Sequence, residues 1–332
     1  MQLHQSRRRE FITLMGVAAA WPLYARAQQP AMPVIGFVNG GTTDTYPDRV
    51  SAFRKGLEES GYVEGRNVTV EYHWLDGRYD RLPALMADFV RRRVAVIATP
   101  YGNAASLAAK AATATIPIVF GAGGDPVKLG LVDSFSRPGG NATGVNIYGV
   151  DLVGKRLALL LELVPNAARV AVLINPANLA YSEATLQNAQ EAARTMGLQI
   201  QVYKAATISE IDGAFAAMAK ERLDALFLAA DSFFGSRRMQ IVPSAARSRV
   251  PAAYGDRESV EAGGLMTYNT NVASVFRQIG VYAGKILMGS KPANLPVVRP
   301  IKLELVVNLR TAKTLGITVP KTVLAFAHDV IE

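Results

Sequence analysis

The feature that most constrains the fold of this 332-residue chain is an internal repeat. Val34 lies in a short apolar run that ends at Asn39, and Val170 lies in a similar run that ends at Asn175, so the two runs are 136 positions apart. Each run has the length and the β-branched content of a buried strand in a parallel sheet. The repeat predicts two copies of one structural plan.

Helical patterns follow both runs at the same offset. One covers residues 48–60 and stops at Gly61, and the other covers 182–196 and stops at Gly197; a glycine at this place is typical of a helix C-cap. The strands that alternate with helices are predicted over 33–39, 67–72, 94–99, 116–121 and 144–148, and again over 169–175, 199–203, 225–229, 250–255 and 264–268. The predicted fold class is therefore α/β, with two similar lobes, each a mostly parallel sheet flanked by helices.

The composition excludes several classes of site. The sequence contains no cysteine, which excludes disulfides, thiolate metal sites and cysteine nucleophiles, and its three histidines, His4, His73 and His328, are far apart. The formal net charge is +9, but the basic residues are spread along the chain and form neither a concentrated basic face nor a known nucleic-acid-binding module. We therefore expect no metal ion, no cofactor and no nucleic-acid partner.

The first 27 residues have the three parts of an export signal. Arg8 and Arg9 precede Phe11 in a pattern that resembles a twin-arginine signal, a short apolar stretch follows, and residues 25–27 (Ala-Arg-Ala) have the pattern of a cleavage site. Outside this segment we find no run of about 18 apolar residues that could span a membrane. We predict cleavage after Ala27 and localisation in the periplasm.

The segments after the predicted strands carry the candidate binding residues. In an open parallel sheet, ligands bind beyond the carboxyl ends of the strands, and two such edges that face each other form a cleft that a hinge can close. These segments are rich in groups that hydrogen-bond to or stack on a small polar molecule. The candidate ligand-binding residues are Asn39, Thr42, Tyr101, Asn103, Gly123, Asp125, Tyr148, Asn175, Asn178, Asp231, Tyr254, Tyr268 and Thr270.

Some of these residues indicate a class of ligand. Tyr101, Tyr254 and Tyr268 could stack on an aromatic or planar ligand, Asp231 could bind an ammonium group, and backbone N–H groups after a strand could bind a carboxylate. Asn and Gly are also common turn formers, so a structural role is an equally good interpretation of any single residue. Tyr148 and Tyr268 could simply line the connections between the lobes.

Longer motifs extend the argument to a family. They are Phe-Gly-Ala-Gly-Gly-Asp-Pro-Val at 120–127, Arg-Pro-Gly-Gly-Asn-Ala-Thr-Gly-Val at 137–145 and Leu-Val-Val-Asn-Leu-Arg-Thr-Ala-Lys-Thr-Leu-Gly at 305–316. In these motifs the chain resembles the ABC-transporter substrate-binding proteins of the tryptophan-binding, TrpX-like type. The resemblance implies a type I periplasmic-binding fold, in which the chain crosses between the lobes near Tyr148, near Thr270 and near residue 300.

The resemblance also implies boundaries and a function. An N-terminal lobe is expected over 28–148 with a later segment at 271–298, and a C-terminal lobe over 149–270 with a later segment at 299–332, joined by a hinge. The expected function is that of a monomeric receptor that does no chemistry, captures a small polar, aromatic or amino-acid-like ligand in the cleft, and delivers it to the permease and ATPase of an ABC importer. Gram-positive members carry a lipid anchor on a cysteine, a residue absent from this sequence.

Two alternatives remain open at this point. One is a periplasmic enzyme, although residues 149–156 depart from a P-loop at Arg156 and residues 121–126 lack the third glycine of a dinucleotide loop. Asp125, Asp231 and Asp256 could still form a pair of catalytic carboxylates. The other alternative is the ligand-binding partner of a periplasmic sensor.

Overall fold

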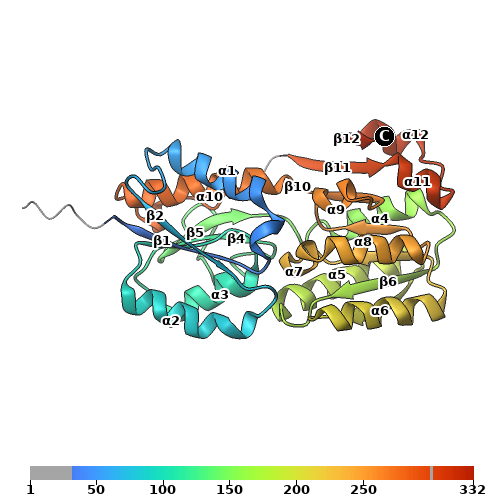
Figure 1. The fold of residues 1–332 in the computed structure, drawn as a ribbon, viewed down its shortest axis with the longest axis horizontal. Coiled ribbons are helices and arrows are strands. Elements are labelled where there is room, and N and C mark those ends of the chain that lie inside the picture. The colour runs from blue at the N-terminus through green and yellow to red at the C-terminus, as the bar shows by residue number, and fades with distance from the viewer. Residues whose placement is uncertain (1–31, 300–301) are drawn as a thin grey trace, which may run out of the picture. The chain divides into compact units, whose positions relative to one another are not determined.

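The computed structural model describes residues 32–299 and 302–332 and builds them around two sheets (Figure 1). The predicted export signal lies outside the described residues. The first sheet is parallel throughout, with the order β2-β1-β3-β4-β5. Its strands are β1 (Val34–Asn39), β2 (Thr69–Trp74), β3 (Val96–Thr99), β4 (Ile118–Ala122) and β5 (Ala142–Asn146).

Two pairs of helices cover the first sheet, one pair on each face. The helices are α1 (Pro47–Glu58) and α10 (Val272–Leu287) on one face, and α2 (Leu82–Arg92) and α3 (Asn103–Ala112) on the other. Phe37 of β1 packs against Phe53 of α1 and Phe276 of α10, with ring centroids 5.2 and 6.1 Å apart. These buried aromatic and aliphatic side chains form the core of the first lobe.

Helix α10 comes from a distant part of the chain and lies beside α1 (Figure 1). Two glycines permit this close approach: a Cβ atom at Gly56 would lie 1.9 Å from the carbonyl oxygen of Arg277, and one at Gly280 would lie 2.1 Å from that of Phe53. Both distances are shorter than any real contact, so a side chain at either position would push the helices apart.

The second sheet has seven strands and contains both parallel and antiparallel pairs. Its order is β12-β11-β10-β9-β8-β6-β7; β11 pairs antiparallel to β10, and all other pairs are parallel. The strands are β6 (Arg169–Ile174), β7 (Gln199–Lys204), β8 (Ala225–Leu228), β9 (Ala252–Tyr254), β10 (Met266–Thr270), β11 (Leu303–Asn308) and β12 (Asp329–Ile331).

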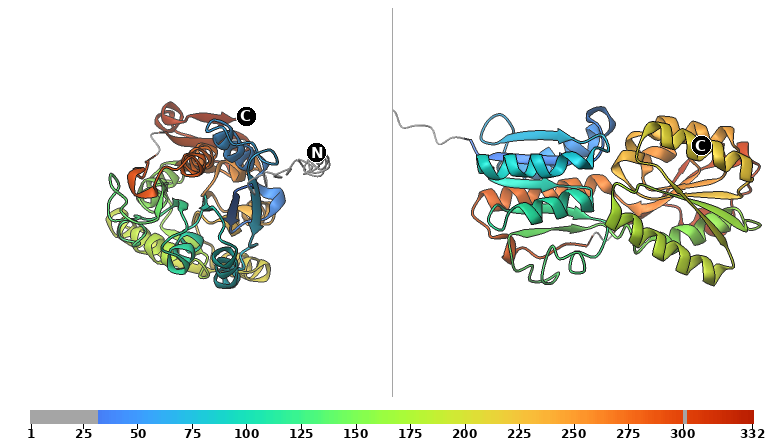
Figure 2. Two further views of the ribbon diagram at one scale, coloured as in Figure 1. Left: turned by 90° about the vertical axis from the view of Figure 1, so that its left-hand side faces the viewer. Right: turned by 90° about the horizontal axis from the view of Figure 1, so that it is seen from below.

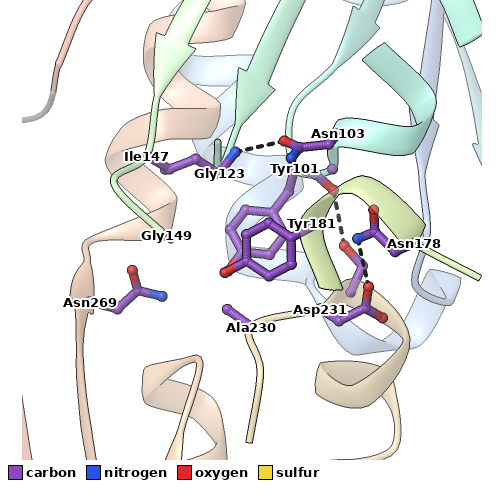
Figure 3. Close-up of a pocket in the computed structure, with 12 residues that line it drawn as sticks. Tyr101, Asn103, Gly123, Ile147, Gly149, Asn178, Tyr181, Ala230, Asp231 and Asn269 are labelled. Atoms are coloured by element: carbon purple, nitrogen blue, oxygen red, sulfur yellow. Dashed lines mark hydrogen bonds between the residues drawn. The ribbon is translucent and has the colours of Figure 1, made fainter. Parts of the chain in front are cut away.

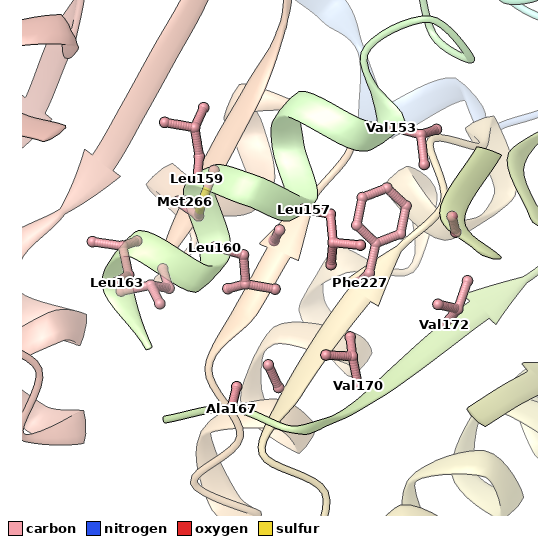
Figure 4. Close-up of a cluster of buried hydrophobic side chains, with 14 of the residues drawn as sticks. Val153, Leu157, Leu159, Leu160, Leu163, Ala167, Val170, Val172, Phe227 and Met266 are labelled. Atoms are coloured by element: carbon pink, nitrogen blue, oxygen red, sulfur yellow. The ribbon is translucent and has the colours of Figure 1, made fainter. Parts of the chain in front are cut away.

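Helices cover both faces of the second sheet as well (Figures 1 and 2). They are α4 (Val153–Leu163), α5 (Leu179–Met196), α6 (Ile208–Glu221), α7 (Ser232–Ser236), α8 (Arg238–Arg247), α9 (Arg257–Glu261), α11 (Leu309–Leu315) and α12 (Lys321–Phe326). Leu157 and Leu160 of α4 lie in one core cluster with Val170 of β6 and Phe227 of β8 (Figure 4). Residues 153–163 therefore form a helix that packs on the second sheet.

The predicted fold class is confirmed, and every strand predicted from the repeat is present. The structure adds β11 and β12, which lie after the second copy and therefore had no partner in the repeat. The chain passes between the sheets after β5, again between β10 and α10, and a third time between Val298, which bridges to Val145, and β11. Short 3-10 helices lie in the connections: η1 (Thr43–Thr45), η2 (Tyr79–Arg81) and η3 (Pro292–Asn294).

Within the described ranges, no helix has both the length and the apolar character needed to cross a membrane.

Candidate ligand-binding site

A small cavity lies where strand ends of the two sheets meet (Figure 3). Segments after β3, β4 and β5 line it from the first lobe and from the connection that follows, and segments after β6 and β8, together with β10, line it from the second lobe. The lining residues are Tyr101, Gly102, Asn103, Gly123, Ile147, Gly149, Asn178, Tyr181, Ala230, Asp231, Ser232 and Asn269. This is the place where doubly wound α/β sheets bind ligands.

The ring of Tyr181 occupies much of the space between the walls. A Cβ atom at Gly123 would lie 2.6 Å from its Cε2, and one at Gly149 would lie 2.8 Å from its hydroxyl oxygen, so both glycines make room for the ring. Tyr181 is only 4% exposed, and its hydroxyl group has no hydrogen-bond partner among the described residues. The remaining cavity measures about 20 Å³, enough for one water molecule. A larger ligand can enter only if the lobes separate or Tyr181 moves.

Asp231 is the best-connected polar side chain of the site. Its Oδ1 accepts hydrogen bonds from Asn175 Nδ2 (3.0 Å) and from the N–H of Phe233 (2.9 Å), which caps the start of α7. Its Oδ2 accepts from Asn178 Nδ2 (2.9 Å) and from the hydroxyl of Tyr79 in the first lobe (3.4 Å). Burial, and then Asp231 itself, raise the pKa of Tyr79, so this phenol stays protonated and donates. The carboxylate is thus satisfied by four donors from the protein.

On the first-lobe side, two asparagine side chains hold the backbone of the site in place. Asn103 Oδ1 accepts a hydrogen bond from the N–H of Gly123 at 2.9 Å, and Asn146 Nδ2 donates to the carbonyl of Gly124 at 2.6 Å. These bonds hold the glycine-rich turn after β4 between the start of α3 and the end of β5.

Direct bonds join the two lobes around the cavity. Ser232 Oγ donates to the carbonyl of Tyr101 at 3.0 Å (Figure 3), and Tyr46 donates to the carbonyl of Ser232 at 3.4 Å. Arg49 of α1 donates from Nε and Nη2 to the two carboxylate oxygens of Glu258 in α9, both at 2.8 Å. The described residues therefore hold the lobes in a closed arrangement.

The Arg49–Glu258 pair is largely removed from water. Arg49 is 1% exposed, and its guanidinium lies 3.8 Å from the centroid of the Tyr46 ring. Burial acts to lower the pKa of Arg49, but Glu258 and Tyr46 outweigh it, and the pKa is raised. For Glu258, burial acts to raise the pKa, but Arg49 outweighs it, and the pKa is lowered. Both groups are therefore charged in the closed form.

A second arginine, Arg156, is buried to the same degree but has a different environment. It is 1% exposed, and burial lowers its pKa. Its Nη1 and Nη2 lie 3.5 Å and 3.3 Å from the carbonyl oxygens of Tyr254 and Leu228, and its guanidinium lies 4.3 Å from the ring centroid of Phe227. Arg156 Nε has no partner among the described residues.

Five of the sequence-predicted site residues line the cavity: Tyr101, Asn103, Gly123, Asn178 and Asp231. Asn175 stands one hydrogen bond away, on Asp231. Whether any of them contacts a ligand stays a prediction.

The other predicted residues lie outside the cavity lining, and each has a visible local role. Tyr254 and Tyr268 pack in the two core clusters of the second lobe. Thr270 donates to the carbonyl of Ile147 at 3.0 Å, at the crossing between lobes. Three other candidates form local hydrogen bonds: Asn39 Oδ1 accepts from the N–H of Gly41, Thr42 bonds to Thr45, and Asp125 accepts from the N–H of Val127. The ring of Tyr148 lies under the guanidinium of Arg299.

The candidates chosen from the sequence omit several lining residues, notably Tyr181 and Asn269, although Asn269 lies in a strand-end segment that was expected to carry function. Tyr181 lies in the first turn of α5, and only its position three residues after Asn178 could have suggested it. Of the three carboxylates Asp125, Asp231 and Asp256, only Asp231 lines the cavity. No group of three His, Cys, Asp or Glu residues suited to a metal ion occurs in the described part of the chain.

Several known proteins are similar to this chain in sequence and structure. A tyrosine-binding protein of Clostridioides difficile is 26% identical over 267 residues, which cover 79% of this chain and 75% of that protein. A crystal structure of a conserved domain protein from Vibrio cholerae is 26% identical, with a TM-score of 0.79 over 90% of this chain and 99% of that one. An ABC domain from Streptococcus pneumoniae in complex with L-Trp has the same TM-score at 24% identity, over 90% and 100% of the two chains, and supports the fold.

The family comparison covers nearly all of the described residues. Residues 32–331 match the family described as ABC transporter substrate binding protein, whose relatives bind ligands rather than transform them. The chain belongs to the ABC transporter substrate-binding protein family.

Proposed function

We propose that this protein captures an aromatic α-amino acid between its lobes and delivers it to the permease and ATPase of an ABC importer. The observation that carries the proposal is the cavity between the sheets, whose walls present Tyr101 and Tyr181 together with the amides of Asn103 and Asn178. Aromatic rings favour an aromatic ligand, and amide groups favour a polar one. The named ligands of two similar proteins, tyrosine and L-Trp, are of this class.

The lobe contacts support capture by closure. An open form admits the ligand, and the bonds from Arg49 to Glu258 and from Ser232 to Tyr101 form only when the lobes meet. Ligand that fills the cleft adds contacts to the closed form alone and therefore shifts the population toward it. A permease can then distinguish a loaded receptor by its closed surface.

The first test is thermal unfolding of residues 28–332 with L-Tyr, L-Trp and L-Phe, and with L-Leu, a nucleoside and a sugar as comparisons. A ligand at about 100 times its dissociation constant stabilises the folded state by roughly 2.7 kcal/mol. We expect the aromatic amino acids to raise the unfolding midpoint most and to be recovered unchanged. The proposal fails if no aromatic amino acid raises the midpoint, and a consumed ligand would point to an enzyme.

A matched pair of variants places the binding event in the cavity. Tyr101→Leu removes a lining ring and should weaken aromatic binding roughly tenfold. Tyr62→Leu changes a half-buried tyrosine of the same lobe outside the cavity lining and should leave binding unchanged. If the two variants change the affinity equally, the ligand does not bind in this cavity.

We also propose that residues 1–27 export the protein to the periplasm and are removed. In cells that carry the full chain, the mature protein should appear in the periplasmic fraction with Gln28 as its first residue. Arg8→Lys combined with Arg9→Lys should retain the precursor in the cytoplasm, because a twin-arginine signal is read through both arginines. Unchanged export of that variant, with cleavage still after Ala27, would assign the signal to the general secretory route instead.

A further inference from the structure

The two fully buried arginines differ in one respect that the proposed function does not explain. Arg49 has a carboxylate partner, whereas Arg156 forms no ion pair with any residue in the ranges 32–299 and 302–332. Its two hydrogen bonds, at 3.5 and 3.3 Å, are longer than ordinary N–H···O bonds, and Nε makes none. A buried charge without an anion is costly, so a protein that retains one gains something elsewhere.

The guanidinium of Arg156 lies at the same sheet edge as the cavity. Its acceptor Leu228 ends β8, two residues before Ala230, and Ala230 lines the cavity. Its acceptor Tyr254 ends β9, and the carbonyl of the next residue, Gly255, accepts from the lining residue Asn269. Arg156 therefore stands directly behind the second-lobe wall.

The charge of Arg156 affects the pKa values of two tyrosines that line the cavity. Burial raises the pKa of Tyr181, and Arg156 is the main group that opposes this rise. Burial also raises the pKa of Tyr101, where Arg49 and Arg156 oppose it. The positive potential of Arg156 thus extends into the cavity, where it favours an anion.

The two nearby carboxylates of the described residues, Asp231 and Asp256, form no ion pair with Arg156. Asp231 already accepts four hydrogen bonds, as described above. Asp256 accepts from the N–H and the hydroxyl of Ser259 at 2.8 and 2.9 Å, and burial raises its pKa, which favours its neutral form. Neither of these carboxylates therefore supplies an anion to Arg156.

We propose that Arg156, together with the hydroxyl of Tyr181, binds the carboxylate of the ligand. The inference rests on the proposed function and names the group by which an amino acid is selected. Tyr181 packs with Val150 and Ala230, and its hydroxyl has no hydrogen-bond partner within the described ranges. When the ring moves aside to admit a ligand, a carboxylate reaches both groups. A guanidinium and a carboxylate form the bidentate pair that this buried fork lacks.

The test compares acids with the amines that lack only the carboxylate: L-Tyr with tyramine, and L-Trp with tryptamine, by calorimetry. The unmodified protein should bind each acid about 100-fold more tightly than its amine. Arg156→Gln should lose this preference by weakening the acid about 100-fold while amine binding stays unchanged. Arg156→Lys retains the charge without the fork and should show an intermediate preference.

The outcomes separate this inference from the function it rests on. If Arg156→Gln misfolds, it should bind the acid and the amine equally weakly. The acid preference of the Arg156→Lys variant then tests the inference. If the unmodified protein prefers the acid and both variants keep the full preference, the carboxylate binds elsewhere and the inference is wrong while the proposed function stands. If the unmodified protein binds neither acid, the proposed function itself is wrong.

Discussion

Arg49 and Arg156 have the same side chain and the same burial, and the difference between them separates two tasks. Arg49 is paired across the lobes with Glu258 and stacks on Tyr46, so its charge is satisfied whenever the lobes are closed. Arg156 lies within one lobe, faces two backbone carbonyls and has no anionic partner in the part of the chain that the structure describes. A paired buried charge specifies one arrangement of the lobes, whereas an unpaired one leaves binding energy for a ligand. Burial alone therefore does not reveal the role of a charge.

The largest effect should come from breaking the paired charge. Glu258→Gln leaves Arg49 buried without an anion and should destabilise the closed form by about 3 kcal/mol, the lower end of the range for a broken buried pair because the Glu258 side chain is 29% exposed. Since the ligand binds the closed form, its dissociation constant should rise up to roughly 100-fold. Calorimetry would measure the affinity, and small-angle scattering of the ligand-free protein would measure the opening.

A matched control has the same bonding geometry at the surface. Arg277 donates to both oxygens of Glu59 at 2.7 Å, but its side chain is 52% exposed. Because solvent screens such a pair, Arg277→Ala should change stability by less than about 1 kcal/mol and leave ligand affinity unchanged. If Glu258→Gln has no larger effect than this control, the buried pair does not hold the lobes together.

A smaller effect of opposite sign is expected from the unpaired charge. Arg156→Met removes a desolvated cation and replaces it with an apolar side chain of similar length, which should stabilise the ligand-free protein by about 1–2 kcal/mol. The unfolding midpoint without ligand should rise, although the amino acid should bind about 100-fold more weakly. A fall in the midpoint instead would show that Arg156 is needed for folding, and the comparison between the two arginines would lose its meaning.

Much of the architecture could be predicted because it is local in sequence. The matched runs around Val34 and Val170, with Gly61 and Gly197 after the following helices, give strands and helices whose periodicity is visible without tertiary contacts. Strands β11 and β12, at one end of the second sheet, could not be derived in this way. They have no counterpart in the first lobe, and β11 joins its sheet through antiparallel pairing with β10.

The site residues also divide into those that local sequence patterns predict and those that depend on tertiary packing. Residues such as Tyr101, Asn103 and Asp231 were found because they directly follow a predicted strand, where the geometry of parallel sheets places ligands. Tyr254 and Tyr268 satisfied the same rule, yet their rings turn into the core of the second lobe. Which face a side chain takes at a strand end depends on packing with distant residues.

Sequence patterns alone were enough to predict two α/β lobes and the sheet edges that line the cavity, because periodicity and turn chemistry act over short stretches of chain. The folded structure was needed to show that Arg49 has an anionic partner, that Arg156 has none among residues 32–299 and 302–332, and that Tyr181 stands between Gly123 and Gly149. The charge state and the accessibility of a group depend on neighbours far away in sequence, such as Glu258, which lies 209 positions from Arg49. These long-range neighbours exist only once the chain has folded.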